Sequence, residues 1–197
     1  MGIRLLTKSR EDTVETVSLL DTSIDEKRSN IDAFVQDRSD LSNLVLVEPP
    51  SSRPWEGPAY FTIRALDDYE LAFAARLSGV EVSNLAPDIQ EEILFPYLWW
   101  MFRLGCVNWR GIYREAKGDE KDPQEIEYKA NRVGPRFSAD DEVMKFIPSE
   151  VIVDIGSVVL NISVLTESEK KASGSQPPTQ ENSTISDKSA VPTEAVG

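Results

Sequence analysis

A long apolar run between a proline and a glycine constrains the fold more than any other feature of this sequence. It extends from Ile89 to Leu104, with large apolar residues at spacings of three and four. Pro87 precedes it at a position that a first helical turn tolerates, and Gly105 follows it. The run therefore predicts a helix that is buried on most of its circumference. Pro96 removes one backbone N–H from its interior, which predicts a kink or a split into two helices.

Around this run the sequence predicts one strand and three further helices. Residues 60–63 are aromatic and β-branched, which favours a strand. Acidic capping residues and helical spacing of apolar residues predict the helices. These are expected after Asp67 up to Gly79, after Asp140 up to Pro148, and from Ser149 through Leu165.

The two ends of the chain differ in composition from the middle. Residues 1–58 are polar and hold four prolines between positions 49 and 58, which predicts a leader or arm with a Pro-rich linker. Whether this arm is poorly packed or becomes ordered on a partner stays open. Residues 172–197 contain no aromatic residue, which predicts a disordered or extended tail. The expected fold class is mainly α: a small helical domain over residues 59–171 with a minor strand element and flexible N- and C-terminal arms.

Charge and composition exclude several functional classes. The chain has 34 acidic and 21 basic residues, a formal net charge of −13, so nucleic acids and anionic membranes are disfavoured as partners. It contains no histidine, which removes His-based catalytic triads and the commonest metal ligand. The single cysteine, Cys106, follows the apolar run and is interpreted as a small buried residue.

Paired carboxylates are the remaining candidates for catalysis. Each pair lies at a predicted helix start, where capping explains it. The pairs are Asp67/Asp68, Glu91/Glu92 and Asp140/Asp141. No nucleotide-binding or calcium-binding motif occurs, so we expect no enzyme, no cofactor and no metal. An enzyme that uses carboxylates alone is the least favoured alternative.

The aromatic residues suggest a partner-binding surface. Trp99 lies off the main apolar stripe, and Trp109 lies between Gly105 and Gly111 in a predicted turn. Tryptophan and arginine are common anchors of protein interfaces. The predicted partner-binding residues are Trp99, Phe102, Arg103, Trp109 and Arg110. The alternative is that both tryptophans are core residues.

The middle of the chain resembles the small tail-assembly chaperone-like and virion-associated proteins of tailed bacteriophages. The resemblance covers residues 59–171, just over half of the chain. Four segments carry it: 61–70 (FTIRALDDYE), 105–112 (GCVNWRGI), 147–152 (IPSEVI) and 162–171 (ISVLTESEKK).

The resemblance implies a non-catalytic assembly factor that binds another phage structural protein, such as a tape-measure, tail or baseplate subunit. A structural virion component, such as a minor capsid, connector or baseplate subunit with ordered arms, is the alternative. No secretion signal is recognisable and the longest apolar stretch is too short to span a bilayer, so we expect action in the host cytoplasm during assembly, without membrane contact. The resemblance leaves open the oligomeric state and whether the protein stays in the virion.

Overall fold

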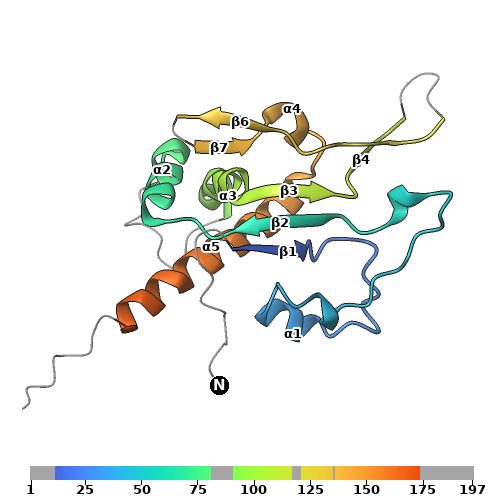
Figure 1. Cartoon of the computed structure of the whole chain (residues 1–197), viewed down its shortest axis with the longest axis horizontal. Helices are drawn as coiled ribbons and strands as arrows, with labels where there is room; N and C mark the ends of the chain where they lie inside the picture. The colour runs from blue at the N-terminus through green and yellow to red at the C-terminus, as the bar shows by residue number, and fades with distance from the viewer. Residues whose placement is uncertain (1–11, 81–90, 117–120, 135, 174–197) are drawn as a thin grey trace, which may run out of the picture.

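The computed structural model describes residues 12–80, 91–116, 121–134 and 136–173 (Figure 1). It is about 41% helical and 21% strand, with three small antiparallel sheets. The expectation of a mainly α fold is therefore wrong, because the fold is a mixture of helices and sheets. The strands are β1 (Thr13–Val17), β2 (Tyr60–Arg64), β3 (Cys106–Arg110), β4 (Tyr113–Arg114), β5 (Gln124–Glu125), β6 (Ala130–Val133) and β7 (Arg136–Ala139). The α-helices are α1 (Ile31–Gln36), α2 (Asp68–Ser78), α3 (Glu91–Gly105), α4 (Asp141–Met144) and α5 (Ser149–Ser173), and two short 3₁₀ turns span Leu41–Asn43 and Pro54–Glu56.

The largest sheet is antiparallel and has the order β1-β2-β3. Phe61 in the central strand pairs with Trp109 on one side and with Thr16 on the other. Phe61, Trp109 and Ile63 are buried, and the residues that alternate with them along β2 are half-buried. One face of the sheet therefore contributes to the main core, as the period of two in a strand requires.

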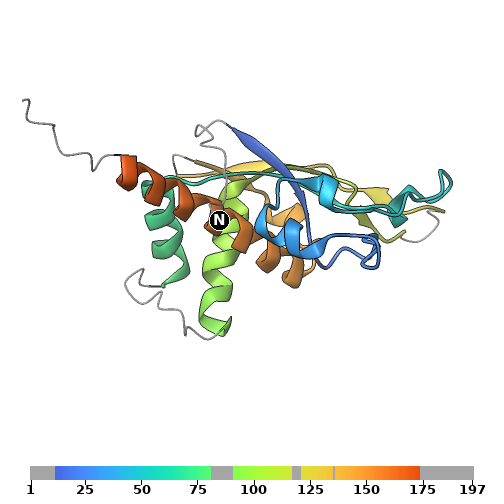
Figure 2. The ribbon, with the colours of Figure 1, turned by 90° about the horizontal axis from the view of Figure 1, so that it is seen from below.

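Helices α3 and α5 pack against the sheet, and α2 packs beside α3 (Figures 1 and 2). Helix α3 packs against α2, α5 and β7, so it lies at the centre of the fold. The predicted burial of its apolar run is confirmed at Tyr97, Met101 and Leu104, each at most 2% exposed. Pro96 lies inside α3, whereas the predicted start of this helix at Pro87 lies outside the described residues.

Helix α2 begins and ends where the sequence predicts. The Asp67 carboxylate accepts the backbone N–H of Glu70, the Glu70 carboxylate accepts that of Asp67, and Gly79 closes the helix at a φ of 72°. Glu70 is 1% exposed and accepts two hydrogen bonds of 2.9 Å from the Arg64 guanidinium. Asp140 likewise caps α4 by accepting the Glu142 N–H. The interpretation of Asp67 and Asp140 as capping residues is confirmed.

Helices α3 and α5 approach each other closely at two glycines. A Cβ on Gly156 would overlap the backbone carbonyl oxygen of Leu98, and a Cβ on Gly105 would overlap a methyl group of Val159. The long α5 helix predicted from Ser149 is confirmed, and its approach to α3 depends on the absence of a side chain at these two positions.

The N-terminal segment differs from the expected arm within its described part, residues 12–58. Val14 and Val17 lie in β1, which pairs with β2. Val17, Ile24, Phe34 and Leu44 form a second, smaller hydrophobic cluster. This segment is thus an integral part of the fold, at the β1 side of the sheet (Figure 1). All but the first two residues of the predicted tail, 172–197, lie outside the described residues.

Candidate functional site

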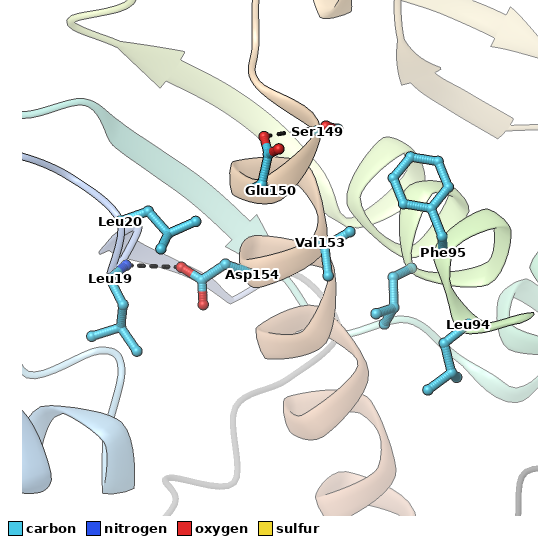
Figure 3. A pocket seen from close by; sticks show the side chains of 9 residues that line it. Leu19, Leu20, Leu94, Phe95, Ser149, Glu150, Val153 and Asp154 are labelled. Carbon is cyan, nitrogen blue, oxygen red and sulfur yellow. Dashed lines mark hydrogen bonds between the residues drawn. The ribbon is translucent and has the colours of Figure 1, made fainter. Parts of the chain in front are cut away.

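An apolar groove lies where α3, the beginning of α5 and the segment after β1 meet (Figure 3). It has a volume of about 670 Å³, is open to solvent and is lined mainly by apolar atoms. This volume falls within the range of ligand-binding clefts in proteins. The lining residues are Leu19, Leu20, Leu94, Phe95, Leu98, Ser149, Glu150, Val153 and Asp154.

Helices α3 and α5 supply most of the apolar lining. Leu94 and Phe95 precede Leu98 in α3 by four and three residues, and residues at these spacings lie on the same face of a helix. Leu98 is 7% exposed and belongs to the main core, whereas Phe95 is 40% exposed at the rim. Val153 projects from α5 towards this face of α3 (Figure 3). The groove is therefore an opening in the contact between two helices.

Leu19 and Leu20 form the opposite wall, and Asp154 on α5 holds that wall in place. Its Oδ2 atom accepts the Leu19 N–H and the Ser18 hydroxyl, each at 2.8 Å. The Arg38 guanidinium donates to both oxygens of Asp154 at 3.1 Å and to the Val17 carbonyl at 2.8 Å. Both side chains are largely buried, so this ion pair connects the N-terminal segment firmly to α5.

Charge is unevenly distributed along the groove. Asp154 is neutralised by Arg38, whereas Glu150 is exposed and accepts a single 3.2 Å hydrogen bond from the Ser149 hydroxyl (Figure 3). The rim therefore presents one exposed carboxylate beside an apolar surface. Such a surface binds apolar groups and orients them by charge.

The cysteine and the carboxylates are the other groups with potential chemistry. Burial raises the pKa of the Cys106 thiol, which keeps it protonated and unreactive at neutral pH. In the part of the chain that the structure describes, no three metal-ligating side chains lie close enough together to hold a metal ion. Among the residues that line the groove, the Ser149 hydroxyl donates to the Glu150 carboxylate at 3.2 Å, and both residues are exposed neighbours in the first turn of α5.

Two of the predicted partner-binding residues, Phe102 and Trp109, lie in the core. Phe102 is fully buried and Trp109 is 4% exposed, with ring centroids 6.5 Å apart in a stacked arrangement. The Trp109 indole N–H donates to the Ile126 carbonyl at 2.8 Å, and Tyr128 packs edge-on against the ring. The segment predicted as a glycine-bracketed turn is instead strand β3, and it directs Trp109 inwards.

The other three predicted residues lie in two separate places. Trp99 is half-buried next to Trp100, and the Arg103 guanidinium lies 4.8 Å from both ring centroids. Arg103 is 7% exposed and pairs with Asp141 at 2.8 Å. Arg110 is exposed, stacks on Tyr60 and pairs with Glu15 at 3.1 Å. The five residues therefore do not form one continuous surface.

The sequence reasoning missed the groove. Phe95 was not distinguished from the other residues of the apolar run, and Leu20 was assigned to the polar leader. The adjacent pair Leu19-Leu20 in an otherwise polar segment was an available signal, because exposed apolar residues in pairs are unusual on a surface. The contribution of Asp154 had no sequence signal, since its partner Arg38 is 116 residues away.

None of the helices in the described residues has both the length and the apolarity that crossing a bilayer requires. No protein-family model matches the sequence, and no curated protein or solved structure shows significant similarity to it.

Proposed function

We propose that this protein is a non-catalytic assembly factor that binds an apolar segment of another protein in the groove between α3 and α5. Leu20 and Phe95 carry the proposal, because these large apolar side chains stay 55% and 40% exposed at the rim of an open cavity. Exposed apolar surface costs about 25 cal/mol per Å² relative to burial. A partner that covers the groove removes this cost.

The net charge of the chain supports a partner with basic residues. At −13, two copies repel each other, and a basic protein is attracted over a longer range. The resemblance of residues 59–171 to tail-assembly chaperone-like proteins points to the class of partner: a phage structural protein, such as a tape-measure, tail or baseplate subunit. On this proposal the protein acts in the host cytoplasm during assembly.

Co-expression with the structural proteins that neighbouring genes encode tests the proposal. We expect one of them to co-purify with the wild-type chain and to be released by Phe95→Ser. Phe137→Ser is the matched control, because Phe137 is 69% exposed on β7 and does not line the groove. Release by Phe137→Ser but not by Phe95→Ser would place the binding surface elsewhere and refute the proposal.

A further inference from the structure

We infer that the groove binds an amphipathic α-helix of the partner, with a lysine or arginine beside its apolar stripe that contacts Glu150. This inference rests on the proposed function and specifies the conformation and the charge of the bound segment. Three observations carry it: the lack of a strand edge among the segments that line the groove, the exposed carboxylate at its rim and the charge of the whole chain.

The backbone of the groove favours a helix over an extended segment. An extended peptide gains affinity by pairing its main chain with a free strand edge. Two sides of the groove are helices and offer no strand edge; their backbone groups bond internally, except in the first turn of α5, where the Ile152 N–H bonds back to the Pro148 carbonyl and the N–H groups before it have no acceptor within the helix. On the third side, the Leu19 N–H donates to Asp154 at 2.8 Å and the Leu20 N–H donates to the Ser18 hydroxyl at 3.2 Å. A helix satisfies its own backbone and needs only the apolar surface that the groove offers.

The two carboxylates of the groove differ in what they can bind. Asp154 accepts four hydrogen bonds, from Ser18, Leu19 and twice from Arg38, so its charge and its lone pairs are occupied. Glu150 lies one helical turn earlier on α5, is exposed and accepts a 3.2 Å hydrogen bond from the hydroxyl of its neighbour Ser149. A cationic side chain at the edge of a bound helix therefore finds its counter-charge at Glu150.

The charge of the chain disfavours the other occupants. A second copy would bring another −13 to the contact, and an anionic ligand would meet Glu150 at the rim. Both are opposed by repulsion, whereas a helix with basic residues gains attraction at the rim and apolar burial in the groove.

Binding of three fluorescent peptides to the full-length chain, measured by anisotropy at low salt, tests the inference. The first is a Leu/Ala/Lys amphipathic helix of about 15 residues, a length at which isolated helices become stable. The second has the same composition except for two central prolines, which prevent the helix. The third carries Glu in place of Lys. We expect the first peptide to bind at least tenfold more tightly than the other two.

Variants of the protein locate the binding and separate the two proposals. Phe95→Ser should weaken binding of the first peptide at least tenfold. Glu150→Gln should weaken it about fivefold, as expected for loss of one partly exposed ion pair. Glu115→Gln removes the same charge from an exposed residue that does not line the groove, so it should leave the affinity unchanged.

Each alternative result overturns a defined part of this account. If the helical and the proline-containing peptides bind equally, and Phe95→Ser weakens both, the groove binds apolar segments but the helix inference is wrong. If Glu150→Gln and Glu115→Gln act equally, the contact of a basic residue with Glu150 is wrong. If the first peptide does not bind, the helix inference is wrong. If it binds the wild-type chain and Phe95→Ser with equal affinity, the groove is not the binding site and the proposed function is wrong as well. A dimer of the wild-type chain that Phe95→Ser dissociates would identify a second copy as the occupant and refute both.

Discussion

Replacing Gly156 with alanine tests how α3 and α5 are held together beneath the groove. The new Cβ would lie 3.0 Å from the carbonyl carbon of Leu98 and would overlap its oxygen. Carbon atoms in contact prefer about 3.5–4.0 Å, so the helices must separate. A backbone carbonyl inside a helix cannot rotate away as a side chain can.

Two effects of opposite sign determine the magnitude. Alanine is favoured over glycine inside a helix by about 1 kcal/mol. Overpacking of a closely packed contact costs about 1–3 kcal/mol, and the rigid backbone of Leu98 places this site in the upper part of that range. We therefore expect Gly156→Ala to lower the free energy of unfolding by about 1–2 kcal/mol, the packing cost less the propensity gain.

Urea denaturation followed by far-UV circular dichroism measures this change. With a slope of about 2 kcal/mol per molar urea, the midpoint should fall by about 0.5–1 M. Asn161→Ala is the matched control, because Asn161 is an exposed residue of the same helix and gains only helix propensity. If Gly156→Ala stabilises the protein as Asn161→Ala does, the close approach of α3 and α5 at this position is wrong.

Three further predictions concern the ion pair, the core and the response to pH. Asp154→Asn leaves the Arg38 guanidinium, 11% exposed, without its counter-charge and should lower the free energy of unfolding by about 3 kcal/mol in urea denaturation. Glu56→Gln, in the exposed pair with Arg53, should lower it by less than about 0.5 kcal/mol. Equal losses would contradict a stabilising role of the Arg38–Asp154 ion pair. Trp109→Ala should lower the free energy of unfolding by about 3–5 kcal/mol because the ring is buried, whereas Arg110→Ala should lower it by less than about 1 kcal/mol. If Trp109→Ala leaves the stability unchanged, Trp109 is a surface residue and its assignment to the core is wrong. Burial raises the pKa of Tyr128 to about 12 and also raises that of Cys106, so the folded state holds these protons more tightly than the unfolded chain does. The contribution of these groups to the free energy of unfolding should be fully present below about pH 9 and be lost as the pH rises towards 12. If the decrease of the free energy of unfolding over this pH range is the same in Tyr128→Phe as in the wild type, the phenol does not contribute to it.

Local signals in the sequence were sufficient to predict α2 and α5. Asp67 and Gly79 mark the ends of α2 by chemistry that acts within a few residues, and the spacing of apolar residues from Ser149 onward is enough to indicate α5. The burial of Tyr97 and Leu104 follows from the density of large side chains around them. These features depend on neighbours in sequence, so a single chain is enough to predict them.

The sheets depend on contacts that the sequence does not place. Strand β1 pairs with β2 more than 40 residues later, and Val14 and Val17 lie on opposite faces that are both covered, so the alternation typical of a strand is absent. The fold class was wrong for this reason. Trp109 did carry a signal, because exposed Asn108 and Arg110 on either side of it give the polar–apolar alternation of β3.

The candidate site was not predictable as a unit. Its lining comes from three segments of the chain. In the sequence, Phe95 is a large apolar residue among others of the same kind in α3, so nothing there separates it from the buried residues of that helix. Only the packing of α5 and Leu19 beside it distinguishes a rim position from a core position. The predicted surface around Trp99 failed to form one patch for a similar reason, since β3 places Trp109 inside and Arg110 on the opposite face of the sheet.

Amide hydrogen exchange, measured on the free protein and on its purified complex with the structural-protein partner, shows which surface of the chain binds. If the groove is the binding site, the backbone amides of Leu94, Phe95, Tyr97 and Leu98 in α3 and of residues 149–154 in α5 become protected on binding, and those of β6 and β7 keep their exchange rates. Protection confined to β6 and β7 around Phe137, or equal exchange of the groove amides in the free and bound protein, would contradict the account.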